Sequence, residues 1–384
     1  MTPGELTRDP RARREVVAAE ALGIDVAGVC SVPHGDEPAP FTEVRIERVY
    51  AGAVSNALRY AGLSGRQRPG PIARELRGLY RLVRLAMRTR ALVRAGRRIG
   101  HVDIVHANDL DTLPAGALLA RRGARLVYDA HELYNDQETD PPRLYHAVAV
   151  TLERRLGRRA DSIVTTAEPF AAAIEARIRP RRPPLIVLNA PECWPAPPDP
   201  RTDGPLRVVY YAAADHEGRP LDDLLDAAQL VVEAAWAVRV VHADTERLER
   251  VIAERGMKDR VSLLRPVAPD RLREALIGQD VGLILQRPIT PNDGLASPNK
   301  LFEYMLAGLA VVAPDLPALA SIVGGEGAGL LYAAGDARSL ADAVRTIAHD
   351  RPLLDRLRRR ARALALERYN AEAQRPVLRR AWNV

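Results

Sequence analysis

Short runs of apolar, mostly β-branched residues alternate along the chain with longer segments whose apolar residues recur every three or four positions. The short runs predict strands and the longer segments predict helices. Most runs are continuous rather than alternating, which is typical of parallel strands covered on both faces. Twelve runs qualify: 24–30, 44–49, 102–106, 125–128, 162–166, 185–188, 207–211, 238–242, 261–264, 281–285, 310–313 and 330–332.

This alternation of strand and helix predicts an α/β fold with right-handed crossovers and a doubly wound parallel sheet, and it occurs twice. A proline-dense stretch at 190–200 separates the two halves, because proline continues neither a helix nor a central strand. We therefore predict a first domain over 1–194, a linker over 195–200 and a second domain over 201–365.

The start of the chain does not fit this pattern. A domain of this kind should open with an apolar strand at the centre of its sheet, and residues 1–10 cannot form one. Asp9 as N-cap and Pro10 at the first helical position instead predict a helix through Ala21. Either the start codon is placed too late or the domain lacks this strand, and we expect the former.

Composition narrows the class of protein. A chain of 384 residues suggests two domains, and 27% charged residues exclude an obligate membrane protein and a disordered one. There is no apolar run near the ~20 residues of a spanning helix and no apolar signal peptide. The only cysteines, Cys30 and Cys193, lie far apart, which excludes a disulfide scaffold and a structural zinc site. A cytoplasmic location is the default expectation.

The net charge of +7 is unevenly distributed. Residues 1–195 carry +7, residues 196–350 carry −7, and residues 351–384 carry +7 again. Such asymmetry suggests that one domain meets an anionic partner and the other does not.

The segment 71–100 predicts an amphipathic helix with nine arginines and one acid. Its apolar residues share one helical face, and an arginine stripe lies on the other. Two interpretations stay open: the apolar face packs on the sheet with arginine in solvent, or the helix contacts anionic lipid or an acidic acceptor at the inner face of the membrane. Nucleic acid is not expected, because aromatic residues are scarce. The apolar face is Ile72, Leu76, Leu79, Val83 and Ala86, and the stripe is Arg74, Arg77, Arg81, Arg84 and Arg88.

The most informative segment is 297–308. Ser297 is predicted to be the N-cap of a short helix, and Gly308 to end it. The amino end of such a helix binds phosphate, and Lys300 adds a charge there. Glu303, one turn on, suits a ribose diol. The alternative is a well-capped surface helix whose lysine and glutamate are solvated.

This segment resembles the donor-site signature of the two-domain, retaining glycosyltransferases of the family 4-like type. Four further stretches are similar to that family in the right order, at 9–15, 106–114, 128–134 and 187–192. The resemblance implies the GT-B fold: two facing Rossmann-like, doubly wound parallel-sheet domains, here with the first strand of the N-terminal domain apparently absent. It also implies that the acceptor binds the first domain, that the nucleotide sugar binds the second, and that a last helix over 366–384 crosses back to the first domain.

The resemblance assigns donor-site roles to five residues. Glu303 matches the carboxylate that binds ribose, Arg219 matches a cation that neutralises pyrophosphate, and Ser297, Asn299 and Lys300 bind phosphate. The family's first signature carboxylate is replaced by Leu295, and residues 212–214 are three alanines where a glycine-containing turn and an arginine are usual.

On the acceptor side the resemblance makes His131 the cleft histidine that contacts the transferring sugar or its phosphate, with Glu132 beside it. Asn108 and Asp109 form a second polar group at the end of the preceding strand, although Asp109 or Asp111 could instead cap the next helix.

We therefore predict a glycosyltransferase that transfers a sugar from a nucleoside-diphosphate sugar, UDP-linked by default, to an unknown acceptor (a sugar, a lipid or a small molecule). Retention follows from the resemblance. No metal and no cofactor are expected. Two alternatives stay open: a nucleotide-sugar-binding subunit with little or no activity, and a nucleotide-sugar epimerase on the same fold.

Overall fold

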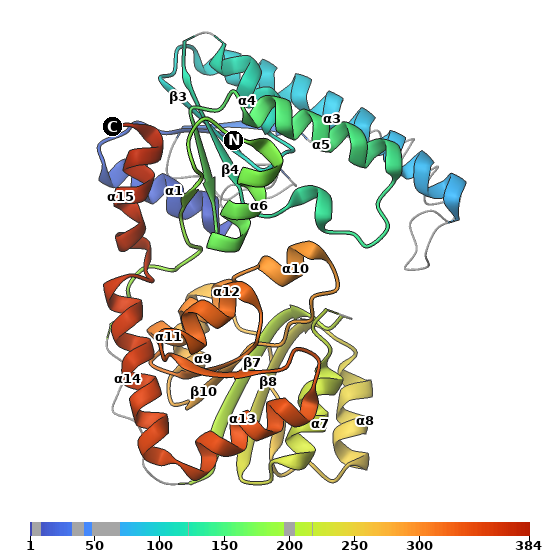
Figure 1. Ribbon diagram of the computed structural model, residues 1–384, viewed down its shortest axis with the longest axis vertical. Helices are drawn as coiled ribbons and strands as arrows, with labels where there is room; N and C mark the ends of the chain where they lie inside the picture. The colour runs from blue at the N-terminus through green and yellow to red at the C-terminus, as the bar shows by residue number, and fades with distance from the viewer. Residues whose placement is uncertain (2–8, 33–41, 48–69, 122, 196–203, 217) are drawn as a thin grey trace. The chain divides into compact units, whose positions relative to one another are not determined.

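A computed structural model describes residues 1, 9–32, 42–47, 70–121, 123–195, 204–216 and 218–384 (Figure 1). The chain divides into two compact units. Unit 1 comprises Met1–Val187 together with Arg375–Val384, and unit 2 comprises Leu188–Gln374. Each unit is an α/β structure whose paired strands are parallel.

Unit 2 contains a six-stranded sheet in the order β12-β11-β10-β7-β8-β9. This is the doubly wound order, in which the chain starts at the centre and builds outwards in both directions. Its elements are β7 (Leu206–Ala214), α7 (Leu221–Leu230), β8 (Ala234–His242), α8 (Thr245–Glu254), β9 (Val261–Leu263), α9 (Leu272–Leu276), β10 (Val281–Leu283), α10 (Pro291–Leu295), α11 (Asn299–Leu306), β11 (Ala310–Pro314), α12 (Pro317–Leu319), β12 (Gly329–Tyr332), α13 (Ala337–His349) and α14 (Arg351–Glu367).

Both faces of this sheet are covered, as its continuous apolar strands require. Helices α7, α8 and α13 contribute to the core on one face, which includes the buried ring of Trp236. Helices α9, α11 and α14 contribute to the core on the other, which includes Phe302 and Tyr304. Short 3₁₀ and π turns (Pro269–Arg271 and Ala320–Gly324) complete the unit.

Unit 1 holds two separate sheets. One has the order β3-β4-β5-β6, and the other pairs β1 with β2. The elements are α1 (Pro10–Ala21), β1 (Ala27–Val32), β2 (Thr42–Glu47), α3 (Pro71–Ile99), β3 (Ile104–Asn108), α4 (Leu113–Ala120), β4 (Arg125–Ala130), a 3₁₀ turn (Tyr134–Asp136), α5 (Arg143–Gly157), β5 (Ser162–Thr165), α6 (Glu168–Ile178), β6 (Leu185–Ile186) and the end of α15 (Ala371–Trp382).

All twelve predicted strands overlap strands of the structure, and the first helix begins as expected. The Asp9 carboxylate accepts hydrogen bonds from the backbone N–H of Arg11 and Ala12, and Pro10 opens α1. Among the described residues no strand lies between the two sheets of unit 1, and residues 2–8, where part of the predicted irregular start falls, lie outside them.

The division between the units differs from the predicted boundaries, 194/195 and 365/366. Leu188 donates its N–H to Gln374 Oε1 (3.1 Å), and Ala371 donates to the carbonyl of Pro191 (2.8 Å). These bonds hold 188–195 in unit 2, because the proline-dense stretch marks where regular structure stops rather than where the core changes. Residues 196–200 of the predicted linker lie outside the described residues.

Helix α15 leaves unit 2 and completes unit 1. Its side chains Leu378, Ala381 and Trp382 pack in a core with Val127 and Val164. The indole N–H of Trp382 donates to His106 Nδ1 at 2.9 Å. Unit 1 is therefore built from two stretches of chain that are far apart in the sequence.

The structure of α3 contradicts the first interpretation of its amphipathic pattern, in which the apolar face packs on the sheet and the arginines lie in solvent. The face expected to pack on the sheet is exposed: Ile72 is 79% exposed, Leu76 and Leu79 are each 51% exposed, and Val83 is 47% exposed. The buried residues of α3 are instead Gly78, Leu85, Leu92, Val93 and Ala95.

The reason lies in the partners of the arginines. Arg81 pairs with Glu138, at 2.5 Å, and stacks over the ring of Tyr145. Arg74 and Arg88 also form ion pairs, with Asp140 and Asp111. These contacts turn Arg74 and Arg81 towards the segment before α5 and Arg88 towards the loop between β3 and α4, and they leave the leucines outside. Among the described residues, no helix is long and apolar enough to cross a membrane.

Candidate active site

The sheet of unit 2 has one topological switch point, where the chain order reverses. Strand β7 lies at the centre and pairs with β8 on one side and β10 on the other. In open α/β sheets, ligands bind beyond the carboxyl ends of the strands at such a point. The turn that carries Arg219 follows β7, and α10 and α11 follow β10. The predicted donor-site residues of unit 2 therefore come together where the topology favours a ligand.

Lys300 lies at the amino end of α11 and is buried, with 7% of its surface exposed. Its ammonium donates to the backbone carbonyl of Tyr211 at 2.7 Å and lies over the ring of Tyr210, 4.8 Å from the centroid. Burial and the nearby charge of Arg219 lower the pKa of Lys300 to about 7, against the opposing effect of Glu303. A second anion beside a buried cation with so low a pKa stabilises the charged form of that cation.

Glu303 lies one turn further along α11. Its carboxylate accepts a hydrogen bond from the hydroxyl of Tyr211, a residue of β7. Burial and the charge of Glu303 raise the pKa of Tyr211 well above its usual value, so its hydroxyl stays protonated and donates. The side chain of Glu303 is thereby oriented at the carboxyl end of β7.

The helix end differs from the prediction in one respect. Ser297 is not the N-cap: α11 begins at Asn299, and Pro298 precedes it without a side-chain cap. The Ser297 hydroxyl is buried with no hydrogen-bond partner among the described residues. Asn299 is half-buried at the first position of the helix. Gly308 ends the helix as expected, with a φ of +73°.

The structure also places the two departures from the family pattern, Leu295 and the alanines at 212–214. Leu295 ends α10, a short helix that a capping box of Thr290 and Asp293 begins. The three alanines at 212–214 continue strand β7.

The predicted residues of unit 1 gather at the carboxyl ends of β3 and β4. The imidazole of His131 lies between two carboxylates: Nδ1 is 3.4 Å from Asp109 Oδ2, and Nε2 is 3.4 Å from Asp129 Oδ2. Burial lowers the pKa of His131, but the charges of Asp109 and Asp129 outweigh it and raise the pKa to about 9. At neutral pH this side chain is an imidazolium, so it can donate hydrogen bonds but cannot act as a base.

Asp109 is held in an unusual conformation. Its φ is +61°, in the left-handed region, and its N–H donates to the carbonyl of Asp129 at 2.8 Å. Burial raises the pKa of Asp109 to about 6, with the charge of His131 acting in the opposite direction. Neither Asp109 nor Asp111 caps the next helix, which begins after Thr112; Asp111 instead accepts from Tyr134.

Sequence reasoning missed the centre of this cluster. Arg11 donates to both carboxylate oxygens of Asp129, at 2.8 and 2.9 Å, and to the carbonyl of Val187 at 2.6 Å. Burial raises the pKa of Asp129, but Arg11 and His131 outweigh it and hold that pKa well below its usual value. The signal was present, since Asp129 lies near the end of an apolar strand, two residues before His131.

Glu15 and Asn108 complete the cluster. The amide of Asn108 donates to Glu15 Oε2 at 2.9 Å. Burial is the main cause that raises the pKa of Glu15 to about 7. Glu15, Asp129 and His131 offer ligand atoms within 4.8 Å of one another, the spacing of a metal site. However, Arg11 already occupies both oxygens of Asp129, and its charge disfavours a cation there. Glu132 is exposed and accepts from Gln137.

Two family models match the chain. Residues 15–189 match the model described as Glycosyltransferase Family 4, and residues 205–350 match the model described as Glycosyl transferases group 1. No protein in the curated comparison matches the chain.

The fold matches many solved structures at low sequence identity. Sucrose-phosphate synthase from Thermosynechococcus elongatus is 17% identical, with 97% of this chain and 92% of that one covered and a TM-score of 0.71. HepE from Anabaena, in complex with UDP, is 15% identical, with 98% and 96% covered and a TM-score of 0.62. TarM from S. aureus is 13% identical, with 78% of this chain covered and a TM-score of 0.61, and the match spans only 59% of TarM.

Proposed function

Because this chain is a glycosyltransferase of the family 4-like type with the GT-B fold, we propose that it transfers a sugar from a nucleoside-diphosphate sugar, UDP-linked by default. The observation that supports the donor site most strongly is the buried Lys300 at the switch point of unit 2. Burial and the charge of Arg219 lower its pKa to about 7, and a diphosphate bound beside it would stabilise the charged ammonium.

In this proposal unit 2 holds the donor through three groups. Lys300 and Arg219 bind the pyrophosphate together with the amino end of α11, whose N–H groups point to the same side. Glu303, oriented by Tyr211, accepts hydrogen bonds from the ribose hydroxyls. The buried hydroxyl of Ser297 and the side chain of Asn299 are further candidates for the phosphates.

The chemistry follows from where charge develops. As the bond from the sugar to the diphosphate breaks, the anomeric carbon becomes positively charged and the leaving group negatively charged. Lys300 and Arg219 stabilise that leaving group electrostatically. The imidazolium of His131, whose two nitrogens face Asp109 and Asp129, contributes positive charge beside the sugar or its phosphate, and Glu132 and Asn108 lie on the same side of unit 1. Retention and transfer without a metal are part of the proposal.

For the acceptor we propose a molecule at an anionic membrane surface. Helix α3 presents exposed leucines beside arginines, and Leu144 and Val148 of α5 are also exposed, at 52% and 39%. The close approach of α3 to α5 at Gly78, where a Cβ would lie 2.6 Å from Pro142, keeps the two helices together. An apolar stripe flanked by arginine is the pattern of a helix that lies in the membrane interface.

The test of the donor site compares UDP binding by the wild type and by Glu303→Ala. A hydrogen bond to a charged group contributes about 1.5–3 kcal/mol, so we expect UDP affinity to fall by roughly 10- to 150-fold by calorimetry. The matched control is Glu274→Ala, which removes an exposed carboxylate paired with Arg271 in the same unit.

Release of UDP from UDP-sugars by the wild-type chain then separates the candidate activities. Release that depends on Glu303 and persists in EDTA supports the transferase without a metal. UDP binding without any release or transfer favours the binding subunit, and the absence of UDP binding overturns the donor site.

A further inference from the structure

Two connections of unit 2 meet beside the proposed donor site, and one arginine joins them. The first connection runs from β7 to α7 and carries Arg219, and the second runs from β10 to α10 and carries Arg287. The backbone N–H of Arg287 donates to the carbonyl of Gly218 at 2.8 Å. The two connections are therefore hydrogen-bonded to each other one residue before Arg219.

The side chain of Arg287 makes a second link between the same connections. Its Nε donates to Asp223 Oδ2 at 3.0 Å, and its Nη2 donates to Asp223 Oδ1 at 2.6 Å. Asp223 lies in the first turn of α7, and its side chain is mostly buried. Two parallel bonds between a guanidinium and a carboxylate fix the orientation of both groups as well as their distance. Arg287 thus holds both the start of α7 and the turn before it.

The side chain of Arg219 is not held by contacts of its own. Among the described residues it takes part in no ion pair and no side-chain hydrogen bond, and only its backbone N–H is bonded, to the carbonyl of His216 at 2.7 Å. Pro220 follows and leads into α7. The place of the Arg219 guanidinium therefore depends on the backbone of this turn, which Arg287 anchors on either side, at Gly218 and at α7.

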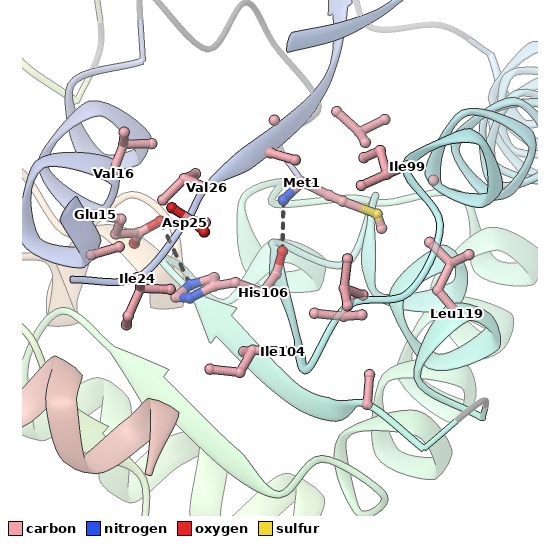
Figure 2. Close-up of a pocket in the computed structure, with 18 of the residues that line it drawn as sticks. Met1, Glu15, Val16, Ile24, Asp25, Val26, Ile99, Ile104, His106 and Leu119 are labelled. Atoms are coloured by element: carbon pink, nitrogen blue, oxygen red, sulfur yellow. Dashed lines mark hydrogen bonds and ion pairs between the residues drawn. The ribbon is translucent and has the colours of Figure 1, made fainter. Parts of the chain in front are cut away.

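Unit 1 holds its own polar residues in a similar way, by pairs that join separate elements. Figure 2 shows Glu15 of α1 facing His106 of β3, with Oε2 and Nε2 3.6 Å apart. Arg11 of α1 binds both carboxylate oxygens of Asp129 in β4. In both units, an arginine with two bonds to one aspartate joins two elements beside the candidate site residues.

We infer that Arg287 is a positioning residue of the donor site, whose bonds to Asp223 and Gly218 place Arg219 where the pyrophosphate binds. The inference rests on the proposed function, because it takes Arg219 as a cation that meets the pyrophosphate. Arg287 acts through Arg219, since its own Nε and Nη2 are both bonded to Asp223. Position is important here because a displacement of about 1 Å removes much of the effect of a binding group.

The variant that tests this role most sharply is Asp223→Asn. It removes a negative charge near an anion site, so electrostatics alone would make UDP bind more tightly. It also breaks the paired bonds to Arg287, so loss of positioning makes UDP bind more weakly. We expect the weaker binding, by about tenfold in calorimetry. The matched control is Asp226→Asn, which removes the same charge further along α7, where Asp226 pairs with Arg255, and should stay within about twofold of the wild type.

A double-mutant cycle separates positioning from a general loss of structure. Arg219→Ala removes the group that Arg287 positions. Arg287→Ala should therefore lower UDP affinity by about tenfold in the wild type and by less than about twofold in the Arg219→Ala background. Uridine lacks the diphosphate, so the same variants should bind it as the wild type does, measured by NMR titration.

Weaker UDP binding by Asp223→Asn, with no further effect of Arg287→Ala once Arg219 is replaced, supports the inference. Unchanged or tighter UDP binding by Asp223→Asn overturns it. So does an equal effect of Arg287→Ala in both backgrounds, or an equal loss of UDP and uridine binding. Full UDP affinity in Arg219→Ala, or no UDP binding by the wild type, contradicts the donor site itself and overturns the inference with it.

Discussion

Lys300, in the proposed donor site, illustrates how burial changes the chemistry of one residue. Lys300 is one of only two lysines in a chain with 54 arginines. An arginine at this place would stay charged, whereas burial leaves the ammonium close to losing its proton. We therefore expect binding of a diphosphate above pH 7 to be accompanied by proton uptake.

This gives a prediction for the pH dependence of binding. The free pKa of Lys300 is about 7, and a bound diphosphate raises it, so the bound state holds more protons above pH 7. We expect affinity for UDP-glucose to be highest below pH 7 and to fall by up to about tenfold per pH unit above it. Calorimetry between pH 6 and 9 checks this. Lys300→Arg should remove the slope, and a slope retained in that variant would contradict the assignment.

Residue types alone predicted the buried polar groups poorly. Lys300, Glu303 and His131 were identified because each stands in a recognisable local pattern at a strand or helix end. Asp129 and Arg11 were not, since their importance comes from a bond between residues 118 positions apart. The predicted N-cap, Ser297, is one position too early, because either it or Pro298 could precede the first turn.

At the scale of elements, the periodicity of the sequence was sufficient to place the strands. It failed for α3, where apolar spacing identified the helix correctly but assigned the wrong face to the interior. Both faces of α3 carry residues able to make contacts, and ion pairs with Asp140, Glu138 and Asp111 decided between them. Such pairings join segments far apart and leave no periodic signal.

The position of α11 depends on a glycine in the strand beneath it. A Cβ at Gly282 of β10 would lie 2.2 Å from the ring of Tyr304 in α11. We expect Gly282→Ala to lower the free energy of unfolding of unit 2 by about 1–3 kcal/mol, measured with urea, because the helix must move. At Gly294 the nearest atom would be 3.6 Å away, so Gly294→Ala should stay within about 0.5 kcal/mol of the wild type. Equal losses would contradict this account.

Helix α3 provides the test of the membrane proposal. Replacing Leu76, Leu79 and Val83 together by serine should abolish sedimentation with vesicles that contain anionic lipid, because the apolar contact is lost. The control replaces Val232 and Val241, which are 64% and 55% exposed in unit 2, by serine. If wild-type protein does not sediment with these vesicles, or the control loses binding equally, α3 is not a membrane contact.

For the whole molecule, the sequence predicted two doubly wound domains, and the structure has them. The exact division was harder to predict, because a proline-rich stretch is visible in the sequence whereas the packing of α15 on α1, β4 and β5 is not. That packing is long-range and rests on a few side chains.

Substitution of one of those side chains tests whether α15 is part of the core of unit 1. Trp382 is 4% exposed, and removing a buried aromatic ring costs about 3–5 kcal/mol. We expect Trp382→Ala to destabilise unit 1 by this amount and to leave unit 2 unchanged, as followed by hydrogen exchange in each unit. Val384→Ala, at a residue 49% exposed, is the control. Equal destabilisation of both units would contradict the division at Gln374.

The return of α15 to unit 1 also has a consequence for biosynthesis. Proteins leave the ribosome from the amino end, and domains usually fold in that order. Here residues 188–374 are translated before Leu378 and Trp382 are available to close the first core. The half that is synthesised first is therefore the half that finishes folding last, and until then the nascent chain exposes the apolar surface that α15 will cover.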